Sequence, residues 1–128
     1  MEDKLTYLLT CARVMRDQPT QLFSYMDVFD ALYIPQPAGF WIQTFYIAGK
    51  LYVAETKHIK IEMSFLYPNG QRSEPSSVEG EANPGYLQFS GNFNSIKFTE
   101  PGRYYLKVKI DGKELEIEDR FYFDVIRL

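Results

Sequence analysis

The clearest pattern of hydrophobic and polar positions lies in the last third of the chain, on both sides of Asp111-Gly112. An Asp-Gly pair supplies the positive φ angles that a two-residue β-hairpin turn needs. With that turn, the charged side chains pair across the strands, Lys107 with Glu116 and Lys109 with Glu114. The apolar side chains share the other face: Leu106, Val108, Leu115 and Ile117. The pattern therefore predicts an antiparallel hairpin with one buried face and one solvated face.

Three more segments upstream read as strands. Residues 58–67 alternate between apolar and polar, which predicts an amphipathic strand. Residues 4–16 and 40–53 instead carry apolar side chains on both faces. In residues 40–53 one face holds Trp41, Phe45 and Ile47, and the other holds Phe40, Ile42 and Tyr46. One face packs on the core, so the second is covered either by another part of the domain or by a partner chain.

The remaining segments are shorter or less regular. Residues 21–33 favour a strand, and a helix over 20–32 is the competing interpretation, because Phe23, Met26 and Phe29 sit near helical spacing. The Pro- and Gly-rich residues 35–39 predict a crossover between sheets. Gly49 predicts a β-bulge within residues 48–50.

The long Pro-, Gly- and Ser-rich stretch at 68–85 predicts a loop, with room for a short edge strand near 76–79. Short strands are expected at 86–89 and 93–98, and the last strand continues through 121–125. The sum is about eight strands in one domain, residues 1–128. We therefore expect an all-β fold, an antiparallel immunoglobulin-like β-sandwich.

Composition narrows the function classes. Net charge is −3 and no basic patch stands out, which argues against nucleic acid and anionic membranes as partners. No secretory signal or transmembrane segment is expected. A single cysteine, Cys11, allows no internal disulfide and suits the cytoplasm. It lies in an apolar strand, where a buried and inert thiol is expected.

The sequence offers few candidates for catalytic or metal-binding residues. His58 is the only histidine and is expected on a wet strand face, so neither a general base with a partner nor a metal site is predicted. Asp27 and Asp30 have too few neighbouring ligands for calcium. Asp119 points inward by parity with Ile117, unless a bend at 118–120 returns it to water. No catalytic motif and no cofactor-binding motif occurs, so we expect no enzyme and no cofactor.

Several segments together suggest a family. They are Leu22-Phe23-Ser24-Tyr25-Met26-Asp27-Val28-Phe29-Asp30 followed by Pro35, then Leu66-Tyr67-Pro68-Asn69-Gly70, and Pro101-Gly102-Arg103-Tyr104 with Val108-Lys109-Ile110-Asp111-Gly112. The chain resembles a family of uncharacterised bacterial proteins that carry a domain of unknown function. The resemblance implies a β-sandwich and supplies no catalytic or binding residues. Gly102-x-Tyr104 also resembles the tyrosine corner of immunoglobulin-like sandwiches, in which the hydroxyl bonds to upstream backbone.

These observations favour a non-enzymatic module for protein–protein interaction or self-association in a bacterial cytoplasm. The strands that are apolar on both faces motivate this hypothesis. The expected contact residues are Trp41, Phe45, Tyr52 and the 35–40 loop, which includes Pro35 and Pro37. The alternative is a small-ligand or carbohydrate-binding sandwich, in which Trp41, Tyr46 and Tyr52 stack on sugar rings and the 68–85 loop borders the site.

Overall fold

The computed structural model describes residues 4–128, and within that range it contains strands and no helix. The strands are β1 (Lys4–Arg16), β2 (Phe23–Phe29), β3 (Ala31–Ile34), β4 (Trp41–Val53), β5 (Lys57–Leu66), β6 (Ser76–Ala82), β7 (Gly85–Phe98), β8 (Gly102–Ile110), β9 (Lys113–Glu114) and β10 (Tyr122–Arg127). The all-β prediction is confirmed, the helix alternative for 20–32 is wrong, and ten strands replace the expected eight. No helix in this part of the chain is long and apolar enough to span a membrane.

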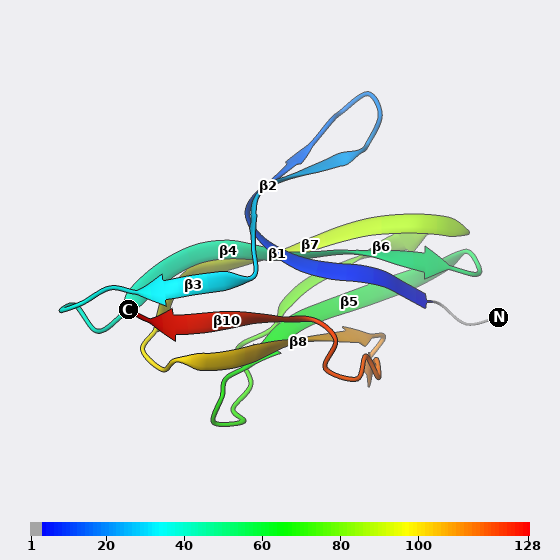
Figure 1. Ribbon diagram of the computed structural model, residues 1–128. Coiled ribbons are helices and arrows are strands. Elements are labelled where there is room, and N and C mark those ends of the chain that lie inside the picture. Colours follow the sequence, from blue (N-terminus) through cyan, green and yellow to red (C-terminus); the bar gives the residue numbers. More distant parts are fainter. Residues whose placement is uncertain (1–3) are drawn as a thin grey trace.

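The strands form two sheets that lie one above the other (Figure 1). The four-stranded sheet has the order β2-β1-β4-β7, and the six-stranded sheet has the order β3-β10-β8-β5-β6 with β9 beside β8. Neighbouring strands are antiparallel, except that β3 runs parallel to β10. Both sheets present an apolar face to the same core.

Residues 21–33, expected as one strand, are two strands in different sheets. β2 pairs with β1 in the four-stranded sheet, whereas β3 pairs with β10 in the six-stranded sheet. The chain changes sheet at Asp30, whose carbonyl accepts a hydrogen bond from the N–H of Asp124 at 2.8 Å. Residues 35–39, which include a cis Gln36–Pro37 bond, then return the chain to β4. The predicted crossover between sheets is therefore confirmed.

The C-terminal hairpin begins as predicted. Ile110 pairs with Lys113 and Lys109 with Glu114 around a turn in which Asp111 has φ 50°. The Leu115 N–H bonds to the Val108 carbonyl at 2.9 Å, and the hairpin ladder then ends.

Beyond Leu115 the predicted pairing is wrong. Tyr105 pairs with Tyr122 of β10, and the predicted pair of Lys107 with Glu116 does not form. The cause is a second tight turn, in which Glu118 and Asp119 have φ of 52° and 53°. That turn exposes Asp119, whose carboxylate lies 2.9 Å from the Lys107 ammonium. The bend that returns Asp119 to water is thus confirmed.

Two smaller expectations change. Gly49 pairs in register with Leu8 and Phe89. The register shifts lie between Leu5 and Tyr7 in the β1–β4 ladder and between Gln43 and Phe45 in the β4–β7 ladder. Gly49 is needed for close packing, because a Cβ there would lie 2.6 Å from Phe89 Cζ. The short strands at 86–89 and 93–98 are one strand, β7, and the edge strand near 76–79 is β6.

The core between the sheets is built from aromatic rings around Phe45. This side chain is fully buried and contacts five rings within about 6 Å: Phe29, Phe65, Phe93, Phe98 and Phe123. Tyr104 is also fully buried, and its hydroxyl donates to the Glu100 carbonyl at 2.7 Å. The bond back to upstream backbone that the Gly-x-Tyr pattern predicts is therefore present.

A second dry layer lies on the outer face of the four-stranded sheet. Cys11 and Ala48 are fully buried there, although neither belongs to the core between the sheets. The β1–β2 hairpin leaves the plane of the four-stranded sheet (Figure 1), but its residues reach back over the outer face: the Tyr25 hydroxyl lies 2.8 Å from the Tyr7 hydroxyl and 3.3 Å from Gln88 Nε2, and the Phe23 N–H donates to Gln88 Oε1 at 3.2 Å. The second apolar face of β1 and of the middle of β4 is thus covered by the chain itself.

Candidate docking surface

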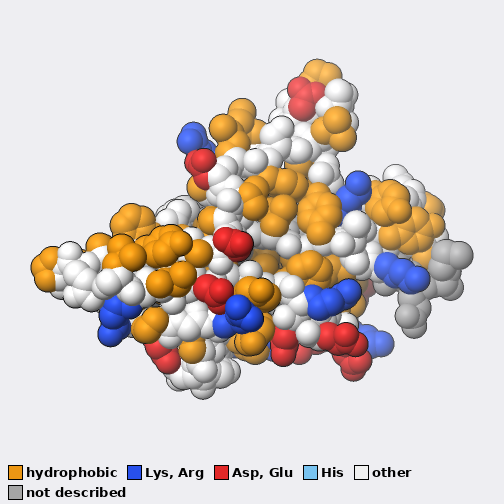
Figure 2. Space-filling view, viewed as in Figure 1, with side chains coloured by type: hydrophobic (Ala, Val, Ile, Leu, Met, Phe, Trp, Pro, Cys, Tyr) orange, Lys and Arg blue, Asp and Glu red, His pale blue; other side chains and the backbone are white. Residues whose placement is uncertain are grey.

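Exposed apolar side chains gather at one end of the sandwich. We call this surface the apolar end and define it by Tyr33, Phe40, Trp41, Ile42 and Ile126. Their side chains are between 38% and 51% exposed. Figure 2 shows apolar side chains gathered at the end where β3, β10 and the 35–40 loop lie.

Three segments build the apolar end. On β3 and β10, Tyr33 pairs with Ile126. Tyr33 lies between the buried Leu32 and Ile34, Ile126 follows the buried Val125, and both side chains face solvent. At the start of β4, Trp41 pairs with Phe98 where the buried core begins. The Trp41 indole N–H donates to Gln43 Oε1 at 2.9 Å, and the Lys97 ammonium lies 4.7 Å from the centre of the Phe40 ring. Both contacts hold rings on the surface without covering them.

The residues predicted to bind a partner do not lie together. Trp41 and Pro37 are exposed at this end, and Pro35 is half-buried beside them. Phe45 is fully buried, so it is a core residue and not a contact residue. Tyr52 lies eleven residues from Trp41, roughly 36 Å along an extended strand, where its ring contacts Tyr86 at 5.5 Å.

Three members of the apolar end, Tyr33, Ile42 and Ile126, are not among the contact residues predicted from the sequence. Tyr33 lies between the buried Leu32 and Ile34, and Ile126 follows the buried Val125, so polarity alone does not mark Tyr33 or Ile126 as exposed. Their proximity is not visible, because it follows from the parallel pairing of β3 with β10, which are separated by most of the chain.

The titratable groups considered earlier lie away from this end. His58 is exposed, and its Nε2 lies 2.7 Å from Glu79 Oε2. That hydrogen bond raises the pKa of His58 and lowers the pKa of Glu79. Burial raises the pKa of the Cys11 thiol to about 11, so the thiolate that reacts is scarce near neutral pH. Within residues 4–128 no three His, Cys, Asp or Glu side chains are placed to share a metal ion.

The rings expected to stack on sugars form no continuous surface. Trp41 and Tyr52 lie near opposite ends of β4, with Tyr46 between them. The ring of Tyr52 meets Tyr86 edge-on at 68°, and the Lys50 ammonium lies 4.8 Å from the centre of the Tyr86 ring. A flat row of rings beside polar groups is therefore not built from these residues.

Comparison with known families gives one match. Residues 6–119 match the model of a family described as a family of unknown function (DUF6941). The chain belongs to this family. The comparison with curated proteins finds no match. The family thus agrees with the resemblance to proteins that carry a domain of unknown function, and it assigns no activity to any residue.

Proposed function

We propose that this chain is a non-enzymatic protein-docking module of a bacterial cytoplasm, which self-associates or binds another protein through its apolar end. The observation that carries this proposal is the exposure of Phe40, Trp41 and Ile42 beside Tyr33 and Ile126. Clustered exposed apolar side chains are uncommon on monomers. A tryptophan at such a surface is the side chain that most often dominates binding energy.

The dry layer beneath the β1–β2 hairpin strengthens this assignment. Most of the second apolar face of β1 and β4 needs no partner, since Cys11 and Ala48 are already fully buried. The large apolar side chains that stay exposed on β4 are those of its first two residues, Trp41 and Ile42. A relation to immunoglobulin-like sandwiches is part of the proposal, supported by the bond from Tyr104 to Glu100.

The mass in solution at rising protein concentration tests self-association. We expect a dimer or larger particle for the native chain and a monomer for Ile42→Lys, which places a charge beside Lys97 in the proposed surface. Leu22→Lys is the matched control, because Leu22 is 63% exposed at the hairpin tip and should leave the mass unchanged. Equal masses for all three proteins contradict self-association.

Docking on another protein needs a second experiment. A photo-crosslinking residue at position 42 should capture a partner in cells of the native host. Capture should be lost with Trp41→Ser and kept with Leu22→Lys. Capture that survives Trp41→Ser, or no capture from a chain that is also monomeric, overturns the proposal.

A further inference from the structure

The two sheets part along one side of the sandwich, where β6 and β7 lie next to each other. Both are edge strands: β6 pairs with β5 and β7 with β4, but β6 and β7 do not pair. They approach closely at Gly91, where a Cβ would lie 2.7 Å from Ser76 Oγ and 2.8 Å from Met63 Cε. They are joined again by the short turn between Ala82 and Gly85. The seam is therefore closed at both ends and open between them.

A cavity of about 360 Å³ opens in the middle of this seam. Its inner wall is apolar and comes from both sheets: Ile59, Ile61, Val78, Leu87 and Phe89. The cavity widens at Gly80, where an added Cβ would meet no atom within 4 Å. Ligand sites begin at roughly 300 Å³ and are lined mainly by apolar side chains. This cavity lies at the small end of that range.

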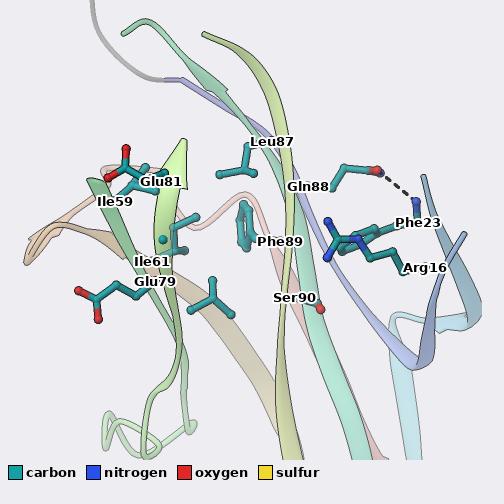
Figure 3. A pocket seen from close by; sticks show the side chains of 12 residues that line it. Arg16, Phe23, Ile59, Ile61, Glu79, Glu81, Leu87, Gln88, Phe89 and Ser90 are labelled. Carbon is teal, nitrogen blue, oxygen red and sulfur yellow. Dashed lines mark hydrogen bonds between the residues drawn. The ribbon is translucent and has the colours of Figure 1, made fainter. Parts of the chain in front are cut away.

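The arrangement of polar groups around the cavity favours a negatively charged ligand. Arg16 and Phe23 reach it from the hairpin, and Figure 3 shows the guanidinium end of Arg16 pointing toward β7. Within residues 4–128 Arg16 pairs with no carboxylate, and its guanidinium lies 5.7 Å from the centre of the Phe23 ring. Glu79 and Glu81 also border the cavity, but their carboxylates point away from β7 (Figure 3). Glu79 is engaged by His58 at 2.7 Å.

We propose that the β6–β7 cavity binds a small amphiphilic carboxylate of about the size of octanoate. Its apolar tail would lie between the sheets against Ile61 and Phe89, and its carboxylate would meet Arg16 at the mouth. A guanidinium suits a carboxylate because it donates two parallel hydrogen bonds. The free edge of β7 adds peptide N–H groups that no strand pairs on that side. This site is separate from the apolar end and does not depend on the proposed docking function.

Titration of the full chain with octanoate, followed by amide NMR, tests the site. We expect the amides of residues 78–82 and 87–90 to shift, and octylamine at equal concentration to cause smaller shifts. Arg16→Gln should weaken octanoate binding about tenfold, the loss expected for one charge-assisted contact. Arg13→Gln, on the exposed part of the same strand, is the matched control and should bind octanoate as the native chain does.

Gly80→Leu tests the cavity itself. A side chain at residue 80 meets open space, and its φ lies outside the left-handed region, so the variant should fold and should lose octanoate binding. Amide spectra confirm the fold. Native affinity in folded Gly80→Leu overturns the proposal, as does tighter binding of octylamine than of octanoate. Shifts confined to residues 40–42, or no shifts at millimolar octanoate, also overturn it.

Discussion

The two outer faces of the sandwich meet solvent in different ways. The outer face of the six-stranded sheet is wet, and its charges pair across neighbouring strands, as His58 does with Glu79 and Arg103 with Asp124. The outer face of the four-stranded sheet is dry at its middle, where Cys11 and Ala48 are fully buried. Its cover is the β1–β2 hairpin, held by contacts among Tyr7, Tyr25 and Gln88.

This difference shows that a strand with apolar side chains on both faces does not by itself indicate a binding surface. Such a strand needs a second cover, and in this chain most of the cover is internal. On this face of β4 the large apolar side chain that stays exposed is Ile42, whereas Trp41 lies on the core-facing side, at the end of the sandwich. The exposed apolar area of such a strand therefore depends on how far the β1–β2 hairpin extends over it, and not on how many apolar residues the strand contains.

The largest expected effect comes from placing a charge beneath the hairpin. In Ala48→Glu a carboxylate would replace a fully buried methyl group. We expect a loss of roughly 3–5 kcal/mol in the free energy of unfolding, because a buried charge without a partner is strongly destabilising. Chemical denaturation measures this loss.

The matched change on the wet face is Lys60→Gln. Lys60 is exposed on the outer face of β5, so the free energy of unfolding should change by within about 0.5 kcal/mol. If Ala48→Glu is tolerated as well as Lys60→Gln, the hairpin does not exclude water from the four-stranded sheet, and the contrast between the two faces fails.

A smaller effect tests whether the hairpin opens separately from the core. Tyr25→Phe removes a hydroxyl that lies 2.8 Å from the Tyr7 hydroxyl, which should cost about 1 kcal/mol. Cys11 lies beneath the hairpin, and burial raises its pKa to about 11. We expect Tyr25→Phe to speed labelling of Cys11 by a thiol reagent about fivefold, since labelling requires local opening.

Tyr104→Phe is the control for this experiment. It removes a hydrogen bond of similar length, 2.7 Å to the Glu100 carbonyl, but from the core between the sheets. Its cost in global stability should be similar, and Cys11 labelling under native conditions should stay at the native rate. Equal acceleration in both variants would mean that the hairpin and the core open as one unit.

The sequence predicts those parts of the fold that local patterns specify. The Asp111-Gly112 turn and the alternation of residues 58–67 follow from turn chemistry and side-chain parity, and both are present. The pairing beyond Leu115 is not predictable in this way, because Glu118 and Asp119 adopt left-handed φ without a glycine.

The candidate surface is predictable only in part, for a related reason. The polarity pattern selects Trp41, which lies at the apolar end, but it also selects Phe45, which has the same parity and lies deeper in the sandwich. The parity of a residue tells which face of the strand its side chain is on, but it does not tell whether that part of the face is buried or exposed. The cover over Cys11 and the pairing of Tyr33 with Ile126 depend on contacts between distant segments, which no local pattern encodes.

The smallest expected effect concerns an ion pair on the wet face. The pKa of His58 is raised from its ordinary 6.5 by the hydrogen bond to Glu79, and the pKa of Glu79 is lowered from 4.5 by the same bond. A raised histidine pKa stabilises the fold fully below pH 6.5, and this contribution is lost as pH rises through the raised value. A lowered glutamate pKa stabilises the fold above pH 4.5, and this contribution is lost as pH falls through the lowered value.

The pair therefore contributes fully only between about pH 4.5 and 6.5. Because His58 is the only histidine, one imidazole NMR signal reports its titration. We expect Glu79→Gln to return the pKa of His58 toward 6.5 and Glu81→Gln to lower it less, since Glu81 acts only through its charge. Both side chains of the pair are more than half exposed, so salt should also lower the pKa of His58. A pKa of His58 that ignores Glu79→Gln would mean that the pair does not form in solution. A pKa that responds to Glu79→Gln but ignores salt would mean that the outer face of β5 and β6 is shielded from solvent.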